Sequence, residues 1–199
     1  MFKKDLTAAP KQKVKSSAQR ALRQQLLDRF PLLNPHIDEV LPKKSSLEQM
    51  KLPDHASLFV VDKTPVFFQC DTPQGAAILP HLRLVHRFPQ AFPTVRIDRG
   101  AIRFVLSGAT LMAPGLTSKG GRLPLVGAEG PRDAAGEDGH WGRELGKGEG
   151  VVIVAEGKEE ACAVGLLVAG TAEVKEKGKG PVVEDAHFLG DGLWALPLD

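Results

Sequence analysis

Basic side chains and glycines concentrate in one stretch of the sequence, from Arg96 to Pro124. Arginines flank a short apolar run, and residues 113–124 then bring three glycines and two prolines together with hydroxyl and basic side chains. Glycines let backbone amides approach a phosphate, and hydroxyl, ammonium and guanidinium groups add charge-assisted hydrogen bonds. The pattern indicates binding of an RNA backbone, and a solvated basic face is the alternative. The candidate contact residues are Arg99, Arg103, Gly115, Thr117, Ser118, Lys119, Gly120, Gly121 and Arg122.

Charge is segregated along the chain, although the formal net charge is only +2. Residues 1–30 carry eight basic and two acidic side chains, and residues 31–80 carry four and six. Residues 81–122 carry seven basic side chains against Asp98 alone, whereas residues 123–199 carry seven against fifteen acidic ones. Such a chain can present a phosphate-binding face and a separate acidic surface. The alternative is that folding intermixes the two.

No motif predicts catalysis, a metal site or a cofactor. The glycine-rich run around Gly148 fails as a phosphate-binding Walker loop, because Trp141 stands where that loop needs glycine and Gly148 where it needs Ser or Thr. The histidines lack the i, i+4 pairing of zinc proteases, the acidic residues of 133–138 miss the spacing of a calcium loop, and no G-x-S-x-G elbow is present. Cys70 and Cys162 lie in apolar runs, which favours buried thiols over nucleophiles.

A short strand, a capped helix and a loop must position the basic stretch. Residues 94–98 predict the strand, and Asp98 suits the N-cap of a helix that ends at Gly108. The loop over residues 113–124 is expected to be exposed. Four residues of the helix are expected to face a core: Ala101, Ile102, Val105 and Leu106.

Apolar periodicity and turn residues predict the remaining elements. Before residue 94 they are a loose or edge segment over 1–15, a helix over 18–30, a short helix capped by Asn34 and ending at Leu41, a hairpin of strands 57–61 and 66–70, and a helix over 79–88. After residue 126 they are a mobile insertion over 127–150, paired buried strands over 151–155 and 161–169, and a hairpin or closing strand around 188–196.

The overall composition fits a soluble globular protein. The chain has 199 residues, of which 42% are hydrophobic, enough for one or two compact domains. No stretch reaches the roughly 18 consecutive apolar residues of a membrane helix, and the first residues run into polar sequence rather than into an apolar signal core. Two cysteines cannot build a disulfide framework. We therefore expect a cytoplasmic protein without a membrane partner.

The run DRGAIRFVLSGATLMAPGLTSKGG, residues 98–121, resembles the opening of a PUA domain, an RNA-binding module named for pseudouridine synthases and archaeosine transglycosylases. Other segments extend the likeness over nearly the whole chain, to the family of malignant T-cell-amplified sequence proteins, known in fungi as a translation machinery-associated protein. These segments are MFKK at the start, LPKK at 41–44, LRLVHRFP at 82–89, APGLTS at 113–118, AEGK at 155–158 and DGLW at 191–194. Family members run almost directly from the basic loop into the next strand, so residues 127–150 depart from the pattern.

The resemblance implies an α+β fold with an N-terminal family-specific α/β domain over residues 1–93 and a PUA pseudo-β-barrel over residues 94–199. It implies a non-enzymatic adaptor that binds the rRNA of the small ribosomal subunit, with the density-regulated protein as heterodimer partner and tRNA as a candidate further ligand. Its expected roles are tRNA release, ribosome recycling and reinitiation, and the N-terminal domain is expected to offer apolar surface to the partner. The alternatives are an accessory RNA-binding subunit of an RNA-modifying enzyme and a scaffold that contacts only proteins.

Overall fold

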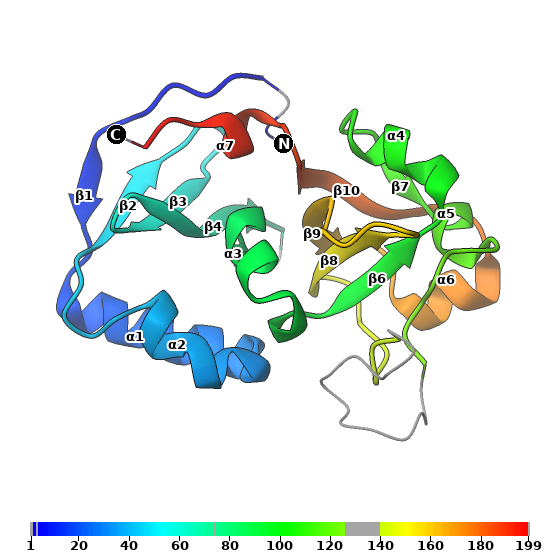
Figure 1. The fold of residues 1–199 in the computed structure, drawn as a ribbon, viewed down its shortest axis with the longest axis horizontal. Coiled ribbons are helices and arrows are strands. Elements are labelled where there is room, and N and C mark those ends of the chain that lie inside the picture. Colours follow the sequence, from blue (N-terminus) through cyan, green and yellow to red (C-terminus); the bar gives the residue numbers. More distant parts are fainter. Residues whose placement is uncertain (1, 3, 74, 126–139, 199) are drawn as a thin grey trace.

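Two five-stranded sheets form the framework of this computed structural model, which describes residues 2, 4–73, 75–125 and 140–198 (Figure 1). The first sheet is antiparallel, and its strands lie in chain order. Asp62 and Lys63 join the third strand to the fourth, and both have positive φ, as the tightest hairpin turns require. The strands are β1 (Lys11–Lys13), β2 (Leu47–Lys51), β3 (Ser57–Val61), β4 (Thr64–Thr72) and β5 (Gly75–Pro80).

Helices lie along one side of the first sheet (Figure 1). α1 (Ser16–Arg29) leads through a 3₁₀ turn, Pro31–His36, into α2 (Ile37–Val40). Leu22, Leu26 and Phe30 are buried because their spacing of four residues places them on one face of the helix. The helix thereby turns its charged face to solvent.

The second sheet has the order β6-β8-β9-β10-β7. Only its β6–β8 pair is parallel among the pairings of described residues. The strands are β6 (Thr94–Ile97), β7 (Leu111–Met112), β8 (Gly150–Ala155), β9 (Ala163–Leu167) and β10 (Pro181–Phe188). The helical segments of this half are the 3₁₀ turn Arg99–Ala101, α4 (Ile102–Val105), α5 (Pro114–Thr117) and α6 (Thr171–Lys177).

The two halves share side chains across their junction. α3 (Leu82–Arg87) and the 3₁₀ turn Pro89–Ala91 lead from the first sheet to the second, and α7 (Gly192–Ala195) follows the second sheet. Leu193 and Leu196 nevertheless belong to the apolar cluster of the first half, together with Phe67 and Phe92. Figure 1 likewise shows α7 beside the first sheet. The C-terminal segment therefore completes the N-terminal core.

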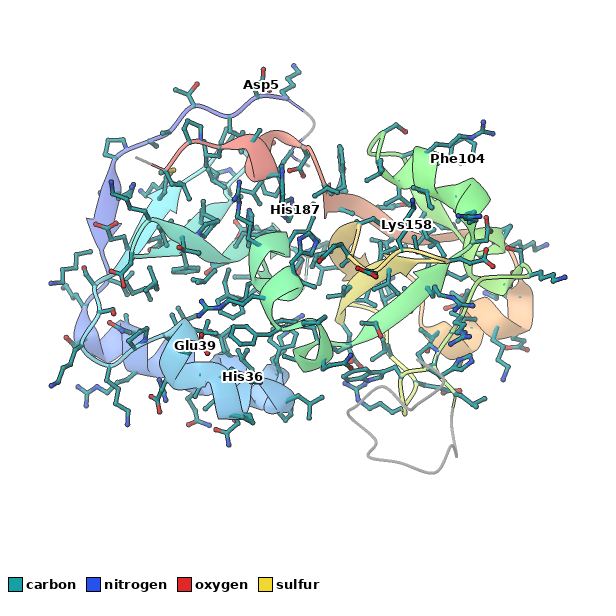
Figure 2. All side chains as sticks on the ribbon, viewed as in Figure 1. Asp5, His36, Glu39, Phe104, Lys158 and His187 are labelled. Carbon is teal, nitrogen blue, oxygen red and sulfur yellow. The ribbon has the colours of Figure 1, made fainter. Side chains whose placement is uncertain are left out.

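A buried polar cluster holds this junction together. His187 is fully buried where the halves meet (Figure 2), and its Nδ1 lies 2.9 Å from the carboxylate of Asp191. Its Nε2 accepts the Leu82 N–H at 3.4 Å, so the proton on Nδ1 is donated to Asp191. His81 packs against it, with ring centroids 4.6 Å apart. Side chains and backbone on both sides of the junction are thus tied together.

Most local predictions are confirmed. The fold is α+β with two sheets, the first helix lies within one turn of its predicted bounds, and the 57–70 hairpin and the paired strands after residue 150 are present. β1 is an edge strand within the segment that was predicted to be loose or an edge, whereas the buried pair of His81 and His187 and the charged strand β2 were not predicted. The proposed boundary at residue 93 stays a prediction.

Four local predictions are corrected by the elements just described. Leu79 and Pro80 end β5 rather than begin a helix, since Leu79 pairs with Phe68 across the sheet. Asn34 lies inside the 3₁₀ turn, and the tail around residue 193 forms a helical turn. Leu106, expected in the core, is 37% exposed.

The predicted insertion at 127–150 falls largely on residues 127–139, which lie outside the described residues. From residue 140 onward the chain is packed: Trp141 and Leu145 are buried in the apolar cluster of the second half. The Leu145 N–H donates to the Thr171 hydroxyl at 2.9 Å. This part of the segment therefore belongs to the core, contrary to the expectation from its polar composition. Within the described ranges, no helix is both long and apolar enough to cross a membrane.

Candidate nucleic-acid interface

Asp98 fixes the start of the candidate interface. It follows β6, and its carboxylate accepts the Ala101 N–H at 3.0 Å and the Ser118 hydroxyl at 2.5 Å. The bond from Ser118, followed by those from backbone N–H groups of Ala101 and Gly100, lowers the pKa of Asp98. Its backbone N–H also donates to the Gly115 carbonyl at 2.9 Å. One ionised residue therefore caps the helical turn, as predicted, and ties it to the basic loop.

The basic loop is more ordered than its composition indicates. Ala113 and Leu116 are buried, and α5 lies in the first half of the segment that was expected to be an exposed loop. The backbone of Arg96 exchanges two hydrogen bonds with that of Arg122, at 3.0 and 2.7 Å, and Arg96 Nε donates to the Gly120 carbonyl at 2.8 Å. The loop is thus held along the free edge of β6.

The three glycines of this loop make room for the protein's own atoms. A Cβ at Gly115 would lie 3.1 Å from the Ala101 methyl group, and one at Gly121 would overlap the backbone carbonyl of Leu116. Gly120 has a φ of +102°, and its Cβ would overlap the Glu156 carboxylate. Internal packing is therefore enough to explain the glycines, and their contact with RNA stays a prediction.

Four predicted cations gather around this edge. Arg99, Arg103 and Lys119 are exposed and Arg122 is half-buried. The Arg103 guanidinium lies over the ring of Phe104, 4.7 Å from its centroid. Thr117 and Ser118 are exposed beside them, but their hydroxyls donate to the Ala113 carbonyl and to Asp98. Among the described residues, no carboxylate forms an ion pair with any of the four cations.

An apolar groove adjoins the cations and was not predicted. Its volume is about 520 Å³, and Phe104 and Met112, which line it, are 51% and 46% exposed. Figure 2 shows Phe104 on the outer side of α4. The signal in the sequence is the unbroken run Phe104-Val105-Leu106, which is too wide for one buried helix face. Cations beside an exposed aromatic ring can bind phosphates and stack on a base.

Exposed apolar side chains are concentrated in the second half. The large exposed ones are Phe104, Leu106, Met112, Leu125 and Leu189. The described part of residues 1–93 contributes none of them, and the expected apolar partner surface on that half stays a prediction.

The two cysteines and the His187–Asp191 pair are buried in environments that do not favour catalysis. Burial raises the pKa of the Cys70 thiol, and burial raises the pKa of the Cys162 thiol to about 12, so both thiols stay protonated. The His187–Asp191 pair has no access to solvent. Across the described ranges, no group of three His, Cys, Asp or Glu side chains could hold a metal ion.

Comparisons with known proteins agree with this architecture. A family model described as a pre-PUA-like domain matches residues 2–89. Translation machinery-associated protein 20 of Saccharomyces cerevisiae is 46% identical over 187 residues, which cover 94% of this chain and 92% of that protein. The malignant T-cell-amplified sequence 1 homolog of Drosophila melanogaster is 43% identical over 184 residues, 92% of this chain and 89% of that protein. A crystal structure of a PUA domain from Aeropyrum pernix superimposes with a TM-score of 0.62 and 19% identity over 95% of each chain.

Proposed function

The chain belongs to the family of translation machinery-associated protein 20 and the malignant T-cell-amplified sequence proteins, and on that premise we propose that it is a non-enzymatic translation factor that docks on the small ribosomal subunit. It binds rRNA through the surface made by Arg99, Arg103, Lys119 and Arg122, here named the basic edge, and it acts in the cytoplasm. Its proposed roles are tRNA release, ribosome recycling and reinitiation. The names of its relatives support a role in translation.

One observation carries the RNA-binding part of the proposal. Arg99, Arg103, Lys119 and Arg122 lie on an edge that Asp98 and Arg96 fix internally, and no described carboxylate pairs with the four cations. Unpaired cations on a rigid edge bind phosphates with little ordering cost. The proposed contacts are these four side chains, with Thr117, Ser118 and the backbone at Gly115, Gly120 and Gly121 beside them.

The test replaces Lys119 and Arg122 by glutamate and measures binding of the full chain to purified small ribosomal subunits at several salt concentrations. Removing two phosphate contacts should reduce the slope of log K against log salt by about 2 and weaken binding about tenfold or more. Lys175→Glu with Lys179→Glu gives the same charge change on and after α6, at two exposed lysines, and should leave binding unchanged. Equal binding by both double variants and the wild type would remove the basic edge from the proposal.

The proposed protein partner is the density-regulated protein, bound as a heterodimer. The resemblance of the chain to its family implies this pairing, and the exposed apolar side chains around α4 offer the partner a surface. Co-purification of the full chain with that protein tests the pairing, and Phe104→Ser with Met112→Ser tests the surface. Capture that is unchanged in the double variant would exclude this groove as the partner surface.

A further inference from the structure

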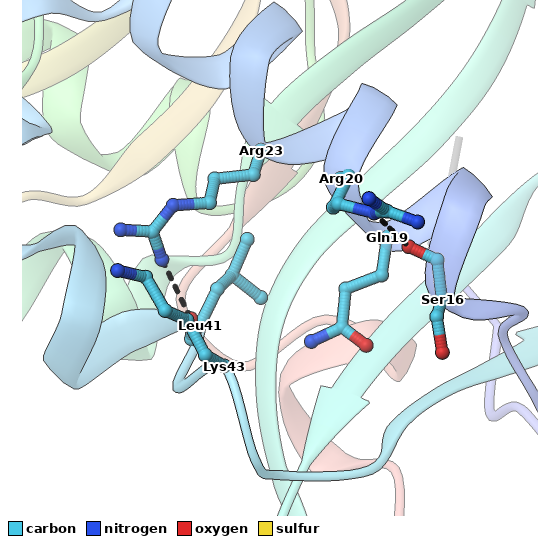
Figure 3. Close-up of a pocket in the computed structure, with 6 residues that line it drawn as sticks. All are labelled: Ser16, Gln19, Arg20, Arg23, Leu41 and Lys43. Carbon is cyan, nitrogen blue, oxygen red and sulfur yellow. Dashed lines mark hydrogen bonds between the residues drawn. The ribbon is translucent and has the colours of Figure 1, made fainter.

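A second basic surface lies in the first half, far from the loop after β7. A pocket of about 430 Å³ opens between the start of α1 and the segment that follows α2. Figure 3 shows its two sides, one bearing Ser16 and Arg20 and the other Leu41 and Lys43. The Gln19 side chain bridges them by donating to the Pro42 carbonyl at 3.4 Å.

One cation of this pocket forms an ion pair within the described part of the protein, and the others do not. Arg23 donates to the Leu41 carbonyl at 2.9 Å and pairs with Asp38 at 2.7 Å, so its charge is balanced and it shapes the wall. Arg20 is exposed and has only a 3.4 Å bond from its Nε to the Ser16 carbonyl. Lys15 directly precedes the lining residue Ser16 in the sequence, and it is also exposed.

Lys43 lines the opposite side of the pocket, Lys44 follows it in the sequence, and both are exposed. No described carboxylate forms an ion pair with these two lysines, with Lys15 or with Arg20. The surface made by Lys15, Arg20, Lys43 and Lys44 around the pocket, here named the α1 basic pocket, therefore keeps a concentrated positive charge. Such a concentration attracts anions and is repelled by other basic surfaces.

The chemistry of the surroundings favours a nucleic acid over a protein as the anion. Protein interfaces use buried apolar or aromatic anchors at their centre. The described residues of this half expose no large hydrophobic side chain, and Leu22 and Leu26 of α1 are buried in the core together with Leu41. Charge without an apolar anchor is typical of phosphate-backbone binding.

We propose that the α1 basic pocket holds a backbone phosphate of rRNA, as a second contact that acts together with the basic edge around Lys119. This inference rests on the proposed docking to the small ribosomal subunit. Figure 1 places α1 and α5 toward opposite ends of the long axis. A folded RNA surface can reach both contacts at once, whereas a short oligonucleotide cannot, and two separated contacts fix the orientation of the protein on the subunit.

The test is Arg20→Glu with Lys43→Glu in the full chain, measured against purified small ribosomal subunits over a range of salt. We expect binding about tenfold weaker or more, and a salt slope reduced by about 2. The charge-conserving variant, Arg20→Lys with Lys43→Arg, should keep wild-type affinity because phosphates accept either cation. Lys51→Glu with Lys63→Glu, at two exposed lysines elsewhere in the first half, should also bind as the wild type does. Thermal unfolding checks that all variants are folded.

The outcomes separate the two proposals. In one outcome the wild type binds subunits, Lys119→Glu with Arg122→Glu loses binding, and Arg20→Glu with Lys43→Glu binds unchanged. This outcome overturns the second contact alone. No binding by the wild type overturns both. If the α1 variant binds subunits normally but loses an acidic protein that the wild type captures, the pocket is a protein site and the RNA assignment is wrong.

Discussion

The carboxylate of Asp191 is the most heavily used polar group in the described core, so its removal gives a sharp test. It accepts hydrogen bonds from His187 Nδ1 at 2.9 Å, from the Phe188 N–H at 3.0 Å and from the Trp194 N–H at 2.9 Å. Both it and His187 are excluded from solvent. The Asp191→Ala variant leaves three buried donors without an acceptor.

The magnitude follows from these contacts. Each unsatisfied buried donor costs about 1–3 kcal/mol, and loss of the cap of α7 alone costs about 1 kcal/mol. Since the donors are neighbours, their costs overlap, and we expect a loss of about 3–5 kcal/mol in the free energy of unfolding. That is a large fraction of the roughly 5–15 kcal/mol that stabilises a typical domain.

Urea unfolding followed by tryptophan fluorescence measures this loss, with Glu176→Ala as the control because Glu176 is an exposed acidic residue on α6. The control should stay within about 0.5 kcal/mol of the wild type. Asp191→Asn keeps one acceptor oxygen and should fall between the two. A loss below about 1 kcal/mol in Asp191→Ala would refute the assignment of this carboxylate as an essential acceptor in the buried cluster at the junction.

Two further predictions concern the same core and the basic loop. Burial, and next the neighbouring His187, lower the pKa of His81 well below its ordinary value. Above about pH 6.5 the free energy of unfolding is therefore independent of the titration of His81. Below that pH it falls by up to about 1.4 kcal/mol per pH unit, because the unfolded state binds a proton that the folded state does not. His81→Gln should flatten the fall in unfolding free energy from pH 7 to pH 5 while His55→Gln, at an exposed site, does not; equal slopes would contradict this. Gly121→Ala should destabilise the fold by about 1–3 kcal/mol, because the added Cβ would overlap the Leu116 carbonyl. Gly146→Ala should not destabilise it, because its Cβ would meet only a Glu149 oxygen at 3.5 Å. Equal melting temperatures of the two variants would show that the loop moves to accommodate the Gly121 substitution.

Local signals explain why some elements were predictable. The helical turn after Asp98 could be predicted from this one N-cap side chain, and α1 could be predicted from apolar residues spaced four apart. β2 carries no such signal, because its buried residues Leu47 and Met50 are three apart and its sequence is charged. β10 shifts register between Glu184 and His187, with a positive φ at Asp185, so its alternation is broken.

Tertiary contacts decide the rest. Trp141 and Leu145 look isolated in a polar sequence and find their partners only when the second core forms. The cations of the basic loop could be proposed from composition, whereas the α1 basic pocket could not, since only the fold brings Arg20 beside Lys43. Composition likewise cannot show that the Arg96 side chain donates a hydrogen bond to the Gly120 carbonyl.

The contribution of Leu193 and Leu196 to the first core has a consequence for synthesis of the chain. Residues 1–93 leave the ribosome first, yet their core stays open until Leu193 and Leu196 have also been made. The Gly192 N–H also donates to the Phe2 carbonyl at 2.7 Å, which joins the two ends of the described chain. Folding of the first half therefore waits for residues 193–196, and a product that terminates before them exposes an unfinished core that quality-control proteases can recognise.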